Sequence, residues 1–163
     1  VVFITVLVVV RPDPPAPAAV DYRAIAAETG ATASLAVPDL PSTWKSNSAI
    51  YDGESLDGVA TWYIGFVTPE NQFVAVRQGI AANPTWLANQ LGSRAATGST
   101  TINGVAWKVY DHRDAKDAGN LAYIMTTEAK ASDIVLFGTA SNAEFSTIAT
   151  AVSSELAANT GKG

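Results

Sequence analysis

Apolar and polar residues alternate over several short segments of the chain, a pattern typical of half-buried β-strands. In residues 59–67, Trp62, Ile64 and Phe66 fall on one face of such a strand. Residues 72–79 follow a Pro- and Asn-containing turn and predict its hairpin partner. Asn103-Gly104 is a strong two-residue hairpin signal. Further strands are predicted at residues 33–37, 48–52, 105–110, 121–129 and 133–140.

Three segments carry helix start signals. Asp21 predicts the N-cap of a helix that runs to Glu28, and Asn83 with a following proline predicts a second helix. Ser141 and Glu144 form a capping box. The apolar face of that third helix comprises Phe145, Ile148, Ala149, Val152 and Leu156. Together these elements predict an α+β fold, an antiparallel β-sheet packed with helices in a layered sandwich. The Gly- and Ser-rich residues 92–101 predict a loop.

The first ten residues are apolar except for Thr5, and Arg11 ends the run. A membrane-spanning helix needs about 20 apolar residues, so we expect these ten to be the C-terminal half of one. The β-branched valines also suit a buried strand, which is the alternative. The expected membrane anchor consists of Val1, Val2, Phe3, Ile4, Val6, Leu7, Val8, Val9 and Val10.

The predicted domain organisation follows from where the apolar pattern changes. Four prolines in residues 11–20 favour an extended linker between the membrane segment and the domain. Residues 21–158 form the predicted α+β domain, and residues 159–163 a flexible tail. Pro38 and Pro41 fix a turn ahead of Trp44, which we expect to close one end of the core.

Composition narrows the possible functions. The chain has 163 residues, of which 48% are hydrophobic and 15% charged, which fits one ordered domain. Its net charge of −5 argues against nucleic-acid binding. Without cysteine and with a single histidine, the chain lacks the residues for disulfides, thiolate sites or a histidine metal site. We therefore predict no cofactor, no metal and no catalytic residue.

The candidate chemical sites are weak. His112 lies in a charged turn beside Asp111, where a solvated histidine is more typical than a general base. Asp111, Asp114 and Asp117, and likewise Asp52, Glu54 and Asp57, lack the spacing of a calcium loop. The four tryptophans fit either a core or the lining of a ligand groove. We expect Trp86 to be partly exposed, so that Trp86 and Trp44 are possible interface residues.

The segments LPSTWKSNSA (40–49), TWYIGFVTPENQFVAVRQ (61–78), INGVAWKVY (102–110) and VLFGTA (135–140) resemble an envelope family of actinobacteria catalogued as domain of unknown function 4245. The resemblance covers roughly residues 20–157 and the preceding apolar segment. It implies a single-pass protein whose domain lies outside the cytoplasmic membrane, and it supplies no catalytic residues. The order of elements is also similar to the Mog1/PsbP-like fold.

These observations favour a non-enzymatic, membrane-anchored extracytoplasmic domain. We expect it to bind the lipid bilayer through its N-terminal helix and to bind other membrane or envelope proteins as an accessory or docking subunit of a larger complex. A respiratory cytochrome bcc–oxidase supercomplex is one such assembly. The alternatives are a lipid or apolar-ligand binding module of the cell envelope, with a groove between sheet and helix, and a hydrolase with an unrecognised site.

Overall fold

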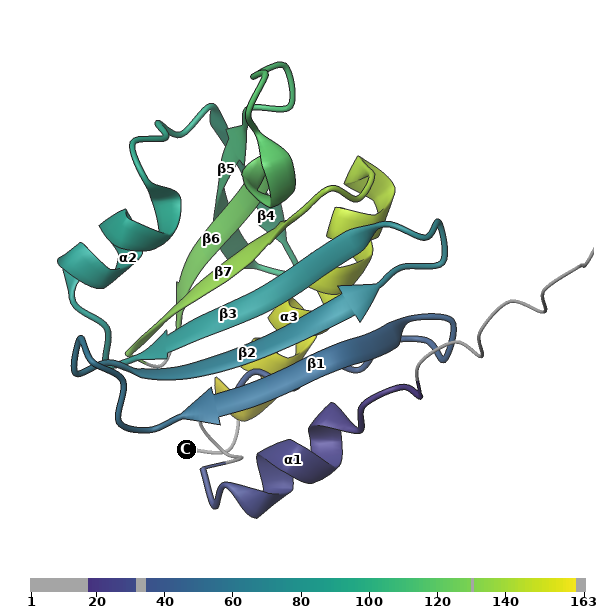
Figure 1. Ribbon diagram of the computed structural model, residues 1–163, viewed down its shortest axis with the longest axis vertical. Helices are drawn as coiled ribbons and strands as arrows, with labels where there is room; N and C mark the ends of the chain where they lie inside the picture. Colours follow the sequence, from purple (N-terminus) through teal and green to yellow (C-terminus); the bar gives the residue numbers. More distant parts are fainter. Residues whose placement is uncertain (1–17, 32–34, 130, 161–163) are drawn as a thin grey trace, which may run out of the picture.

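A computed structural model describes residues 18–31, 35–129 and 131–160 of the chain. One antiparallel sheet of seven strands forms its centre, in the order β1-β2-β3-β7-β6-β5-β4 (Figure 1). The strands are β1 (Lys45–Asp52), β2 (Ala60–Val67), β3 (Phe73–Ile80), β4 (Gly98–Ile102), β5 (Val105–Asp111), β6 (Tyr123–Ala129) and β7 (Ser132–Gly138). The predicted α+β class with an antiparallel sheet is confirmed.

Two runs of consecutive strands build the sheet. β1, β2 and β3 form one run, and β4, β5, β6 and β7 form the other. They join where β3 pairs with β7, from Val74 opposite Gly138 to Ile80 opposite Ser132. β3 ends the first run and β7 ends the second, and these two strands pair in the middle of the sheet.

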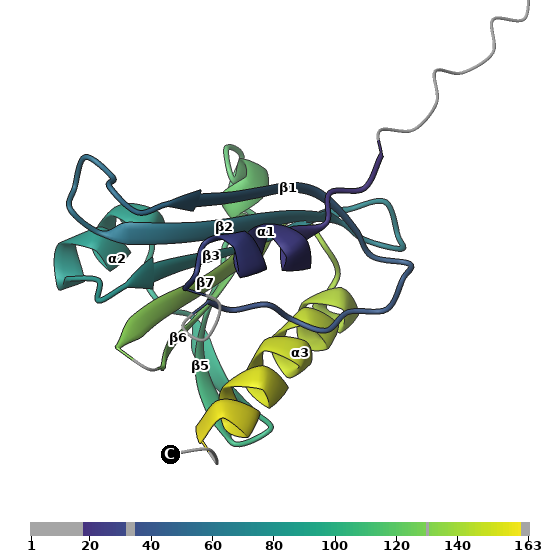
Figure 2. The same cartoon turned by 90° about the horizontal axis from the view of Figure 1, so that it is seen from below.

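Helices cover the two faces of the sheet unequally. α1 (Tyr22–Glu28) and α3 (Asn142–Thr160) lie on one face, where they bury the larger apolar core (Figure 2). α2 (Pro84–Leu91) packs on the other face over a smaller cluster. Trp86 of α2 lies flat against Gly79 of β3, where an added Cβ would come within 2.9 Å of the indole ring. A glycine is therefore what lets α2 approach the sheet.

The predicted helix starts are confirmed by their capping contacts. The Asp21 side chain accepts from the Ala24 N–H at 3.0 Å, and the Asn83 side chain accepts from the Trp86 N–H at 2.9 Å. At α3, the Glu144 N–H donates to Ser141 Oγ at 3.4 Å, and Glu144 Oε2 accepts from the Ser141 N–H at 3.4 Å. The capping box expected from the sequence is therefore formed.

Two local expectations were wrong. Residues 98–101, part of the loop expected at 92–101, belong to β4, which pairs with β5 from Gly98 opposite Val109 to Ile102 opposite Val105. Residues 35–37, part of an expected strand at 33–37, form no strand. There the Ala36 carbonyl accepts from Trp62 Nε1 at 2.8 Å, and the Ala36 N–H donates to Gln78 Oε1 at 2.7 Å. The side chains of Trp62 and Gln78 therefore satisfy the backbone groups of Ala36 that a neighbouring strand would otherwise have to satisfy.

The predicted membrane segment, residues 1–10, lies outside the described residues, as do most of the linker and the residues 161–163 of the tail. Within the part of the chain that is described, no helix combines the length and the apolar character that a membrane crossing requires. The anchor therefore stays a prediction from the sequence.

Candidate functional site

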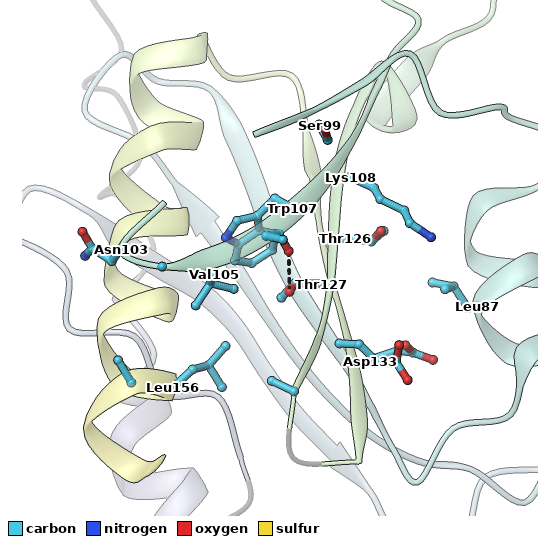
Figure 3. A pocket seen from close by; sticks show the side chains of 15 residues that line it. Leu87, Ser99, Asn103, Val105, Trp107, Lys108, Thr126, Thr127, Asp133 and Leu156 are labelled. Carbon is cyan, nitrogen blue, oxygen red and sulfur yellow. Dashed lines mark hydrogen bonds between the residues drawn. The ribbon is translucent and has the colours of Figure 1, made fainter. Parts of the chain in front are cut away.

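A cleft of about 910 Å³ opens where β5 and β6 separate (Figure 3). The two strands pair over four residues only, from Lys108 opposite Thr126 to Asp111 opposite Tyr123. Beyond that point β5 continues toward α3 while β6 continues beside β7. The Thr127 hydroxyl donates to the Ala106 carbonyl at 2.8 Å, which bridges the two strands where the regular pairing stops. The cleft lies beyond this bridge.

Contacts with α3 explain why the strands separate. Trp107 of β5 is fully buried, and its Nε1 donates to Ser153 Oγ of α3 at 3.0 Å. At the tip of the β4–β5 hairpin, Asn103 Nδ2 donates to Ser154 Oγ at 2.9 Å. These two bonds attach the hairpin to the C-terminal half of α3 instead of to β6. Asn103 and Gly104 both have positive φ, which is the geometry of a type I′ turn.

The walls of the cleft differ between the two faces of the sheet. On the α3 side they are mainly apolar and include Val105, Trp107, Leu156 and Ala157. On the α2 side they carry Lys108, Glu128, Asp133 and Leu87. A pocket with apolar walls and a few polar groups at one side is the usual form of a small-molecule site.

The two carboxylates of the cleft lie directly opposite each other. Glu128 of β6 pairs with Asp133 of β7 in the register of the sheet. Like charges in such a pair repel. Partial burial raises the pKa of the Asp133 carboxyl, the neighbouring Glu128 raises it further, and Lys108 opposes both. The α2 side of the cleft is therefore a region of net negative charge.

The sequence-predicted interface residues lie elsewhere and are buried. Trp86 is 2% exposed beneath α2, so the expected partial exposure was wrong. Its ring is covered because it stacks on Gly79. Trp44 is 8% exposed and packs edge-on against Phe66 at a centroid distance of 6.3 Å, which confirms its predicted place in the core. Neither ring offers a surface that a partner could cover.

The candidate chemical groups are occupied by local contacts. His112 Nε2 lies 3.0 Å from the Ala95 carbonyl, and Asp111 pairs with Arg113 at 3.4 Å. In the 52–58 turn, Asp57 Oδ1 accepts from the Ser55 hydroxyl and from the Val59 N–H, which lowers the pKa of its carboxyl. Among the described residues, no group of three or more histidine or acidic side chains is placed to hold a metal ion.

Sequence reasoning included a ligand groove between sheet and helix as an alternative, but it did not predict where the cleft lies. Trp107 was recognised as one of four tryptophans that suit a core or a groove, and it forms part of the cleft wall. The Asn103-Gly104 turn was also recognised, and it sets the tip of the hairpin that borders the cleft. What no short motif indicates is the divergence of β5 from β6, because it depends on contacts with α3, which begins about thirty residues later in the chain.

A family model described as protein of unknown function DUF4245 matches residues 1–152. The chain therefore belongs to this family, which confirms the resemblance drawn from its sequence motifs. No curated protein and no solved structure matches the chain. The similarity to the Mog1/PsbP-like fold stays a prediction.

Proposed function

We propose that this chain is a non-enzymatic, membrane-anchored extracytoplasmic domain that serves as an accessory or docking subunit of a larger envelope membrane complex. A respiratory cytochrome bcc–oxidase supercomplex is one candidate assembly. The apolar residues 1–10 and the proline-rich linker support the anchor. The single observation that carries the docking role is the open outer edge of β4.

β4 ends the sheet with an unprotected edge. Its residues Gly98–Ile102 contain no charge and no proline, and the first four are exposed. Ile102 and Val105 flank a two-residue turn, and such flanking residues form a hydrogen-bonded pair. By alternation, the backbone groups of Ser99 and Thr101 point away from β5. An edge of this kind is a template for an added strand.

The position of β4 also favours docking away from the membrane. The described chain begins beside the opposite edge, where the Val20 N–H donates to the Ser46 carbonyl of β1 at 2.9 Å. β4 is the last strand at the other end of the sheet. A linker that enters beside β1 therefore leaves the β4 edge free to pair with an extended segment of a partner subunit.

Purification of the full chain from native membranes in mild detergent, followed by mass spectrometry, tests this proposal. We expect stoichiometric membrane-protein partners with the natural chain and with Thr101→Val, which keeps the strand edge. Thr101→Pro removes an outward N–H and blocks an added strand, so the partners should be lost. A chain that purifies without partners, or equal recovery with both variants, would contradict docking at β4.

A second function, a binding module for a lipid or another apolar ligand, is favoured by the cleft between β5, β6 and α3. Its volume lies within the range of small-molecule sites, roughly 300–1,000 Å³, and its α3 side is apolar. Co-purification of lipid with a chain that has no protein partner would support this second function over docking.

A further inference from the structure

The cleft is a site with two chemically different ends. It is lined both by Leu156 of α3 and by Leu87 of α2, which cover opposite faces of the sheet. Because β5 and β6 no longer pair beyond Lys108 and Thr126, the opening reaches residues of both faces. A ligand in the cleft would therefore contact both the apolar and the charged walls.

The apolar end suits a hydrocarbon chain. Val105 of β5 is partly exposed and Ala157 of α3 is exposed. The buried Trp107 and Leu156 complete the apolar lining (Figure 3). The indole N–H of Trp107 is already bonded to Ser153, and the Asn103 amide is bonded to Ser154. These polar groups are therefore satisfied without a ligand, and apolar surface remains as the main contact. Burial of apolar surface stabilises such a complex by roughly 25 cal/mol per Å².

The charged end carries an excess of negative charge. Glu128 and Asp133 face one another across β6 and β7, and Lys108 is the cation that the described residues place in the same lining. Among the described lining residues, one lysine balances one of the two carboxylates, which leaves these residues with a net charge of −1. A positive group would relieve the repulsion between the carboxylates, whereas a second anion would add to it.

We propose that this cleft binds a single-chain amphiphile, with the hydrocarbon chain between β5 and α3 and a positively charged head group beside Glu128 and Asp133. The inference deepens the second of the two proposed functions and rests on it. It does not depend on docking at β4. The ligand class is an alkyl chain with an ammonium group, whether free or part of a larger lipid.

Cysteine protection tests the inference, because the natural chain has no cysteine. Ala157 and Ala158 are adjacent exposed residues of α3, but only Ala157 is among the cleft-lining residues. In the full chain, Ala157→Cys and Ala158→Cys are each alkylated with iodoacetamide, and the rates are followed by mass spectrometry. The measurement is repeated with dodecyltrimethylammonium or dodecanoate below their micelle concentrations.

We expect dodecyltrimethylammonium to slow alkylation of Ala157→Cys roughly tenfold once its concentration is about ten times Kd. Dodecanoate should slow it much less, and Ala158→Cys should be unaffected by either compound. Adding Glu128→Gln and Asp133→Asn to Ala157→Cys should remove the preference for the cationic compound. Equal slowing at both cysteines would overturn the inference, because it would indicate general partitioning into detergent or lipid.

The remaining outcomes separate the two levels of the proposal. Stronger protection by dodecanoate, or a cationic preference that survives the double substitution, would overturn the head-group assignment but leave an apolar-ligand module in place. No protection by either compound would overturn this inference together with the second function. The docking function would be untouched, because its test is the recovery of protein partners.

Discussion

The two edges of the sheet are protected in different ways. At β1, the register shifts between Ser46 and Ser48, the strand ends carry Lys45 and Asp52, and α1 packs alongside. Bulges, charges and a covering element all discourage a further strand. β4 has neither a charge nor a register shift within Gly98–Ile102, and α3 packs beside it. The comparison indicates that the β1 edge is closed to a partner strand. The β4 strand packs against α3 on one face of the sheet, while its outward backbone groups stay open to a partner strand.

The largest expected effect comes from removing the tryptophan that holds the β4–β5 hairpin on α3. Trp107→Ala should lower the free energy of unfolding by about 3–5 kcal/mol. It also leaves the buried Ser153 hydroxyl without its indole donor. Trp44→Ala, near the β1 edge, should cost less because no indole hydrogen bond is lost with the more exposed ring. Urea denaturation followed by circular dichroism measures both, and a loss below about 1 kcal/mol for Trp107→Ala would contradict this account of the hairpin.

Proline at neighbouring positions of β4 should distinguish its inner and outer sides. Thr100 pairs with Trp107 in the hydrogen-bonded positions of the hairpin, so Thr100→Pro should cost about 3 kcal/mol. The N–H of Thr101 points outward, so Thr101→Pro should change stability by less than about 1 kcal/mol. Thermal unfolding of the two variants gives the comparison. Equal losses would mean that the outer edge of β4 is already hydrogen-bonded.

A smaller effect is expected from loosening the cover of the β1 edge. The Tyr22 hydroxyl of α1 donates to the Pro38 carbonyl at 2.7 Å in a buried position. Tyr22→Phe keeps the ring contact with Phe66 but leaves that carbonyl without its donor, which should cost about 1–2 kcal/mol. Tyr51→Phe, on β1, is the matched control. Chemical denaturation measures the free energy of unfolding of both variants. If both equal the natural chain, α1 covers the β1 edge by apolar packing alone.

The smallest effects concern the pH dependence of stability, with opposite signs at two carboxyls. The folded-state pKa of Asp133 is raised from 3.8 by burial and by Glu128, so this group costs stability as the pH rises through and above that value. The pKa of Asp57, in the β1–β2 turn, is lowered by its bonds to Ser55 and Val59, so its contribution is present above 3.8 and is lost as the pH falls.

Substitution of each aspartate checks those signs. In a urea denaturation series from acidic to neutral pH, Asp133→Asn should remove a decrease of stability with rising pH. Asp57→Asn should remove an increase. Changes of the same sign in the two variants would contradict the assignment of the negatively charged region beside the cleft.

Local signals predicted most of the fold. The caps at Asp21, Asn83 and Ser141 form because side-chain oxygens satisfy backbone N–H groups within one turn, so the few residues around each helix start contain the needed information. The Asn103-Gly104 turn is equally local. Alternation predicted β2, because Trp62, Ile64 and Phe66 share the face that packs into the larger core. The turn after β2 predicted β3 as its hairpin partner.

What the sequence did not predict depends on distant contacts. β4 is rich in Gly, Ser and Thr and has little apolar content, and it becomes a strand because β5 pairs with it. Residues 35–37 are apolar, yet the side chains of Trp62 and Gln78 bind the Ala36 backbone. Trp86 is buried because Gly79, seven residues earlier, has no side chain. The cleft likewise requires β5, β6 and α3 together.

The pairing of β3 with β7 has a consequence for how the chain folds. Val74 meets Gly138, sixty-four positions later, and α3 comes after β7 in the described chain. During synthesis, β1–β3 are complete long before β7 is made. The side of β3 that later pairs with β7 is therefore a temporary open edge. Contacts between such distant residues slow folding because a long loop must close first. A nascent chain that stops before Ser132 would therefore expose the edge of β3 to other unfinished chains. If such a chain is released from the ribosome, we expect it to aggregate and not to form a smaller stable domain.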